Sequence, residues 1–167
     1  MNTALNIKRT EQKPMDIGVE RRDRKKLADE LSVALADTYV LYGLTQHVHW
    51  NVTGPLFYGV HKMTEEQYQD LGTAIDGLAE RIRAIGFVAP GGFNQMLAMT
   101  RMDKIEDAHD PHDMLRLLIN GNEACARTLR AAVIRANEYD DVKTADLLTD
   151  RIGQHEENIW MLRAILS

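Results

Sequence analysis

The sequence predicts an all-α protein that folds as a four-helix bundle, and three observations lead to this fold class. Four long stretches carry apolar residues at three- and four-residue steps, which is the period of one face of a helix. Glycine and proline residues interrupt the chain between the first three of these stretches. The composition is low in proline and rich in leucine, alanine, glutamate and arginine, which favour helix. Four helices with one apolar stripe each bury those stripes most simply against one another.

The first two helices are expected on either side of a short connection. The first apolar pattern begins near Arg21 and stops at Thr53-Gly54-Pro55, a strong helix breaker. The second pattern runs from about Phe57 to Ile85, and it ends before Gly86. These boundaries predict two helices of similar length in the first half of the chain.

A long connection, residues 86–110, is expected to span the length of the bundle as one crossover. The apolar run Phe93–Met99 predicts a short helix within it. Asp110 followed by Pro111 is typical of a helix N-terminus, with an N-cap and then proline at the first helical position. The third helix is expected to reach about Ala136, and the fourth to follow a break at residues 138–141.

Residues 1–18 show no apolar periodicity and contain Pro14 and Gly18, which predicts a flexible N-terminal tail, residues 1–20, before the four-helix-bundle domain, residues 21–167. The net charge is −5, yet residues 1–26 carry eight basic and four acidic side chains. A basic tail on an acidic body is a candidate contact for DNA phosphates. The alternative is a solubilising tail followed by a charged first helical turn, and charge alone favours this alternative.

The single cysteine, Cys125, excludes an intramolecular disulfide, and its spacing among apolar residues indicates a buried thiol. The N-terminus lacks the apolar core of a signal peptide, and no apolar run approaches the roughly 18 residues of a membrane span. We therefore expect a cytoplasmic protein with no membrane partner, located at the nucleoid if it binds DNA.

The candidate metal ligands lie on the first two helices. His49 falls on the apolar face of its helix, where a hydrogen-bonded core histidine is the simpler interpretation. On the second helix, His61 and Glu65 are four residues apart, and so are Asp76 and Glu80. All four share one stripe of the helix, whose alternative interpretation is a solvated face. Imidazole together with carboxylate suits iron, manganese or zinc.

The spacing along the second helix has a consequence for assembly. His61 and Asp76 are fifteen residues apart, so roughly 22 Å of straight helix separates them. Within one chain they cannot bind the same metal ion. Two copies of the helix, packed antiparallel across a two-fold axis, would bring His61 and Glu65 of one subunit to Asp76 and Glu80 of the other. A metal site of this kind requires an oligomer.

The same residues resemble the signature of the Dps family, the DNA-binding proteins from starved cells, which are small relatives of ferritin. The resemblance rests on the segment 46–54, on Phe57 and on the segment 76–81, and it extends from about residue 22 to the end of the chain. The family has two histidines twelve residues apart, an aspartate fifteen residues later and a glutamate four after that. Here the corresponding residues are His49, His61, Asp76 and Glu80.

The resemblance implies a ferritin-like four-helix bundle and a ferroxidase centre shared by two subunits. His49 and His61 would come from one subunit, and Asp76 and Glu80 from its partner, with two iron ions at each site. Trp50 would lie beside the site, where it could intercept radicals or transfer an electron; its alternative role is to anchor the end of the helix.

The sequence departs from the family pattern at two positions near the centre. Glu65 stands where many relatives have aspartate, so its role as a further metal ligand is open. Lys62 stands where many relatives have an acidic residue thought to help nucleate mineral. Glu65 and Glu66 would then have to supply the nucleation site.

Three further acidic residues begin the fourth helix: Asp141, Asp146 and Asp150. In the family this region lines the three-fold pores through which iron enters, and carboxylates there would draw cations inward. The alternative is favourable negative charge at a helix N-terminus, which is equally well supported for Asp141.

The function implied by the resemblance is iron(II) oxidation, with hydrogen peroxide as the preferred oxidant, and storage of iron inside a hollow shell of twelve subunits. Iron is the expected metal, with zinc or manganese as substitutes. The alternative is a DNA-compacting shell whose metal sites only brace the subunit interface, with DNA as a partner of the N-terminal tail.

Overall fold

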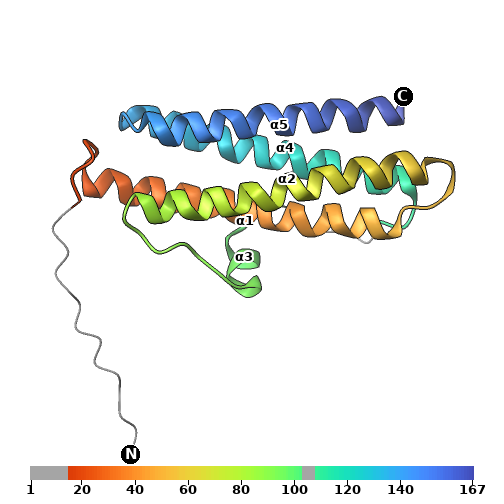
Figure 1. The fold of residues 1–167 in the computed structure, drawn as a ribbon, viewed down its shortest axis with the longest axis horizontal. Coiled ribbons are helices and arrows are strands. Elements are labelled where there is room, and N and C mark those ends of the chain that lie inside the picture. The colour runs from red at the N-terminus through yellow and green to blue at the C-terminus, as the bar shows by residue number, and fades with distance from the viewer. Residues whose placement is uncertain (1–14, 103–107) are drawn as a thin grey trace, which may run out of the picture.

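The computed structural model describes residues 15–102 and 108–167, and these form a bundle of four long helices (Figure 1). The all-α fold class, the single long crossover and its short helix are confirmed. The elements are α1 (Arg21–Asn51), the short 3₁₀ helix η1 (Gly54–Leu56), α2 (Phe57–Ala84), α3 (Phe93–Met99), α4 (Pro111–Glu138) and α5 (Val142–Leu166). The described helices include none with the length and hydrophobicity of a membrane span.

The bundle consists of two helical hairpins packed side by side. In Figure 1, α1 and α2 form one hairpin and α4 and α5 form the other, and α1 packs against both α2 and α4. The crossover leaves the end of α2 and returns along the outside of the α1–α2 hairpin, where α3 packs against α1 (Figure 1). This connection allows α4 to run in the same direction as α2.

The ends of the helices follow from local chemistry. Gly54 adopts a φ of 78°, which a residue with a side chain rarely accepts, and so it permits the tight connection between α1 and α2. The side chain of Asp110 accepts a hydrogen bond from the backbone N–H of His112, and Pro111 occupies the first turn. The predicted N-terminus of α4 is therefore confirmed in its capping residue as well as its position.

The core is built mainly from leucine. Its fully buried large side chains include Leu31, Leu41, Leu118 and Leu148. Burial of each such side chain contributes about 1.5–3 kcal/mol to folding. Cys125 lies in this core and burial raises the pKa of its thiol, so it remains protonated and unreactive.

A buried carboxylate joins the crossover to the bundle. Asp37 of α1 is 0% exposed, and one of its oxygens accepts hydrogen bonds from the Thr100 hydroxyl at 2.6 Å and the Arg101 backbone N–H at 2.7 Å. Its other oxygen accepts from the Thr128 hydroxyl of α4 at 2.6 Å. Asp37 therefore holds three separate parts of the chain together.

The packed part of the chain begins before α1. Arg24 is buried, and its guanidinium donates to the backbone oxygens of Met15 and Val19 and to that of Ile85 at the end of α2. Part of the expected tail, residues 15–20, is thus attached to the bundle. Residues 1–14, with the basic residues Lys8, Arg9 and Lys13, lie outside the described residues.

Candidate metal centre

The α1–α2 hairpin brings His49 and His61 face to face. His49 lies two residues before the end of α1, and His61 lies in the second turn of α2. Their rings stack with centroids 3.9 Å apart and planes inclined by 16°. Because η1 makes the connection so short, two residues twelve apart in the sequence become neighbours in space.

The two histidines exchange hydrogen bonds with each other's backbone. Nδ1 of His49 donates to the carbonyl oxygen of His61, and Nδ1 of His61 donates to the carbonyl oxygen of His49, each over 2.9 Å. A carbonyl only accepts, so both Nδ1 atoms carry hydrogen and both neutral rings present Nε2 as an unprotonated nitrogen. Metal-binding histidines are commonly oriented by a hydrogen bond of this kind.

Three residues of α2 surround the histidine pair. The hydroxyl of Thr64 is fully buried, donates to the carbonyl oxygen of Val60 and lies 3.4 Å from Nδ1 of His49. The ring of Tyr68 meets His49 edge-on at 5.1 Å, and the ring of Phe57 stacks on His61 at 5.2 Å. These contacts hold the imidazoles in place before any metal binds.

Glu65 lies one helical turn after His61 and is already paired with a cation. Lys62 donates to its carboxylate at 2.9 Å. This hydrogen bond and the positive charge of Lys62 lower the pKa of Glu65, and the proximity of the two histidines acts in the same direction. Glu65 is therefore ionised at neutral pH, but a metal ion at this position has to compete with Lys62 for it.

Asp76 and Glu80 lie further along α2, and both are exposed in the single chain. Within the described residues of one chain, no three histidine, cysteine, aspartate or glutamate side chains converge on a common metal position. This agrees with the roughly 22 Å expected between His61 and Asp76 along a straight helix. Assignment of Asp76 and Glu80 to a shared site remains a prediction about a second subunit.

Trp50 and Glu66, which the sequence places near the centre, are both exposed. Trp50 follows His49 directly, and 67% of its surface is exposed in the single chain. Glu66 follows Glu65 on the outer side of α2. Both of the roles considered for Trp50, beside the centre or as an anchor, remain predictions.

The three acidic residues at the start of α5 differ in their surroundings. Asp141 is 4% exposed and is the N-cap of α5, because it accepts hydrogen bonds from the backbone N–H and the hydroxyl of Thr144. It also forms an ion pair with Arg81 of α2 at 2.6 Å. Asp146 and Asp150 are exposed, and Lys143 donates to Asp146. The structure thus shows the capping role for Asp141, while Asp146 and Asp150 keep carboxylates available at the surface.

Several residues that shape this region have no role that the sequence alone predicts. Thr64 supports the histidine pair, Arg81 anchors Asp141, and Tyr68 packs against His49. Tyr68 shares the α2 stripe with His61 and Glu65, so its position on the helix was an available signal. The partners of Arg81 lie more than fifty residues away in the sequence, and no local pattern could identify them.

Comparisons with known proteins agree with this architecture. The ferritin-like domain family matches residues 28–167. The chain is 35% identical over 154 residues to an uncharacterized low temperature-induced protein of Nostoc sp. This match covers 91% of this chain and 86% of that protein. It is 31% identical over 143 residues to DNA protection during starvation protein 2 of Bacillus anthracis. This match covers 86% of this chain and 98% of that protein.

Among solved structures, the Dps protein of Vibrio cholerae superposes with a TM-score of 0.87 and 30% identity, and the match covers 95% of this chain and all of that one. That protein is described as a member of a broad superfamily of ferritin-like diiron-carboxylate proteins. The fold, the histidine hairpin and these similarities lead to one conclusion: the chain belongs to the Dps family of ferritin-like proteins.

Proposed function

We propose that this protein oxidises iron(II) at sites shared between two subunits and stores the oxidised iron. The observation that supports this most strongly is the pair of hydrogen bonds between His49 and His61, which leaves two neighbouring Nε2 atoms free to bind metal. The exposed carboxylates of Asp76 and Glu80, on the same helix as His61, are the acidic ligands that a partner subunit would contribute.

The ligand set fits iron(II) as a substrate. Two neutral imidazoles and a few carboxylates bind divalent first-row metals and leave coordination positions open for an oxidant. With hydrogen peroxide, two iron(II) ions supply the two electrons that reduce one peroxide molecule to two water molecules, and two protons are consumed. Because both electrons come from iron, no hydroxyl radical is released. Zinc and manganese accept the same ligands and are the expected competitors.

Storage requires an assembly with an interior. We propose a hollow shell of twelve subunits, in which iron enters through pores lined by Asp146 and Asp150. Carboxylates at a pore attract cations and raise their local concentration. Inside the shell, Glu65 and Glu66 would provide the carboxylates on which oxidised iron collects.

The experiment that tests the proposal follows the ferric absorption band after iron(II) and hydrogen peroxide are added to the apoprotein. The variant His61→Ala should oxidise iron much more slowly than the wild type. The variant His47→Ala is the matched control, because His47 is on the same helix two residues from His49 and its neighbour is Asn51 rather than His61. Equal rates for the wild type and His61→Ala would refute the assigned site.

A second candidate function is DNA binding, suggested by the relatives named as DNA protection during starvation proteins. The basic residues proposed for it are Lys8, Arg9 and Lys13. A gel-shift titration over a range of salt concentrations tests this, because binding through phosphates weakens steeply with salt. A variant that lacks residues 1–14 should lose the shift; retention of DNA by this variant would exclude the tail as the contact.

A further inference from the structure

A continuous series of aromatic rings leads away from the histidine pair. The ring of Tyr68 on α2 meets His49 at 5.1 Å, and Tyr42 on α1 meets Tyr68 at 6.2 Å, both nearly perpendicular. Tyr39, one turn before Tyr42, continues the series at 6.4 Å. We call these three side chains, Tyr68, Tyr42 and Tyr39, the tyrosine series.

The series crosses between helices and ends at the crossover. Tyr68 belongs to α2, whereas Tyr42 and Tyr39 belong to α1, so the ring contacts between Tyr68 and Tyr42 link the two helices. Beyond Tyr39, the next ring is Phe93 of α3, at 5.8 Å. Phenylalanine is far harder to oxidise than tyrosine, so Tyr39 is the last ring of the series that can readily lose an electron.

The three rings of the series are held in place by their surroundings. All three side chains are partly buried. The hydroxyl of Tyr42 is a hydrogen-bond partner of the Gln46 amide at 3.0 Å. A Cβ atom built on Gly72 would lie 3.7 Å from the Tyr42 ring, so α2 backbone covers one edge of this tyrosine.

We infer that the tyrosine series transfers an electron to the metal centre when peroxide meets a site that holds one iron(II) ion instead of two. This inference rests on the proposed function, since it needs iron(II) and hydrogen peroxide as the reactants. It gives the protein a second source of electrons and moves the oxidising equivalent away from the metal-binding histidines. A tyrosyl radical within the protein replaces a hydroxyl radical in solution.

The electrons and atoms of this step balance. One iron(II) ion loses one electron and becomes iron(III). One tyrosine loses one electron and its phenolic proton and becomes a tyrosyl radical. Together with one further proton from water, these reduce one molecule of hydrogen peroxide to two molecules of water. Tyr68 is oxidised first because it touches His49, and electron transfer from Tyr42 and then Tyr39 restores it.

Trp50, directly after His49, offers a competing route for the same electron. Trp50 is 67% exposed in the single chain, whereas Tyr68 packs directly on a metal-binding histidine. A radical on Trp50 would form at the surface of the subunit, and a radical on the tyrosine series would form inside the α1–α2 hairpin. Identifying the oxidised residue therefore distinguishes electron transfer from Trp50 from electron transfer through the tyrosine series.

The experiment uses the full-length protein with iron(II) below the number of sites, so that many sites hold a single ion. Samples frozen shortly after addition of hydrogen peroxide are examined by electron paramagnetic resonance, and aged samples are digested to locate oxidised residues by mass spectrometry. The wild type should show a tyrosyl signal, with oxidation at Tyr42 and Tyr39. The variant Tyr68→Phe keeps the ring and removes only the hydroxyl, and it should lose both the signal and those modifications.

The control is Tyr58→Phe, because Tyr58 lies on the same helix, is 72% exposed and is no member of the series. This variant should match the wild type. Ferric absorption with excess iron(II) should be the same in the wild type and in Tyr58→Phe, since pairs of ions then supply both electrons. A wild type that oxidises iron without a tyrosyl signal, a signal that survives in Tyr68→Phe, or oxidation confined to Trp50 would overturn the inference and leave the proposed function standing. Failure of the wild type to oxidise iron at all would overturn both.

Discussion

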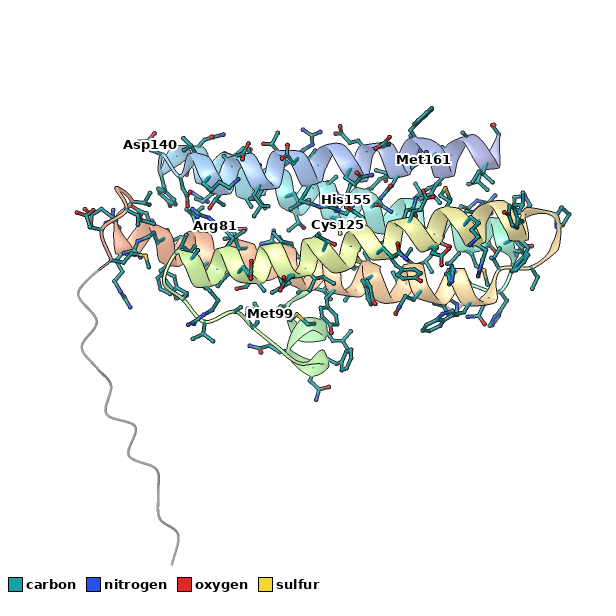
Figure 2. The ribbon with its side chains drawn as sticks, in the orientation of Figure 1. Arg81, Met99, Cys125, Asp140, His155 and Met161 are labelled. Carbon is teal, nitrogen blue, oxygen red and sulfur yellow. The ribbon has the colours of Figure 1, made fainter. Side chains whose placement is uncertain are left out.

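Arg81 donates to Asp141 at 2.6 Å and thereby ties the C-terminal part of α2 to the first turn of α5. Arg81 also donates to the Thr144 hydroxyl, which in turn donates to Asp141. Figure 2 shows Arg81 at the end of the bundle where the chain turns from α4 into α5, close to Asp140. Both carboxylate oxygens of Asp141 thus accept hydrogen bonds from residues of the same subunit.

This relationship predicts different effects for the acidic residues of α5. Asp141→Ala removes the helix cap and leaves the largely buried guanidinium of Arg81 without its partner, which should cost about 3 kcal/mol of stability. Asp146→Ala should change stability by less than about 0.5 kcal/mol, because its side chain is 60% exposed. Urea denaturation at one protein concentration measures both effects.

The same pair of variants separates stability from iron uptake. If Asp146 lines a pore, Asp146→Ala should slow the appearance of the ferric band while the unfolding midpoint stays unchanged. Similar unfolding midpoints for Asp141→Ala and the wild type would show that the ion pair with Arg81 contributes little.

Asp37 provides a second prediction, about the crossover. Asp37→Ala leaves the hydroxyls of Thr100 and Thr128 and the backbone N–H of Arg101 without their acceptor, and we expect a loss of about 3 kcal/mol. The control is Asp29→Ala on the same helix, whose exposed ion pair with Lys25 should be worth less than about 1 kcal/mol. Equal unfolding midpoints for the two variants would contradict the role assigned to Asp37.

His155 predicts how stability depends on pH. It points into the middle of the bundle from α5 (Figure 2), and its Nδ1 lies 2.8 Å from the amide oxygen of Asn122. Burial lowers its pKa to about 3. In the unfolded chain the pKa returns to its ordinary value near 6.5, so at intermediate pH the unfolded state binds one more proton than the folded state.

The contribution of His155 to stability is therefore complete above pH 6.5 and falls as the pH is lowered towards 3. The slope from this single group approaches about 1.4 kcal/mol per pH unit. His155→Gln should flatten the fall in urea midpoint between neutral and mildly acidic pH, whereas His112→Gln, which changes an exposed histidine, should leave it unchanged. A slope that is the same in the wild type and His155→Gln would contradict this assignment.

Much of the fold could be predicted because its signals are local. The apolar period marks each helix, Gly54 marks the first connection, and Asp110-Pro111 marks the start of α4. The anchors of the bundle could not be predicted in this way. Arg24 meets the end of α2 and Asp37 meets both the crossover and α4, and these partners are distant in the sequence.

The candidate centre also combines features that the local sequence predicts with contacts that it does not. The spacing of His49 and His61 identifies both residues, but their mutual hydrogen bonds depend on how tightly the α1–α2 turn closes. The pairing of Glu65 with Lys62 follows from their spacing of three residues on one helix. The position of Asp141 on the fourth helix was clear, whereas its burial depends on Arg81.

The central claim is that each site takes its histidines from one subunit and its carboxylates from another. Two inactive variants, His61→Ala and the double variant Asp76→Ala with Glu80→Ala, can be unfolded together, refolded in equal amounts and assayed for iron oxidation. In a mixed two-fold dimer, one of the two sites receives intact histidines from one chain and intact carboxylates from the other. Random pairing therefore predicts recovery of about a quarter of the wild-type sites. Refolded mixtures as inactive as either variant alone, alongside a wild-type control that regains full activity, would contradict the shared site.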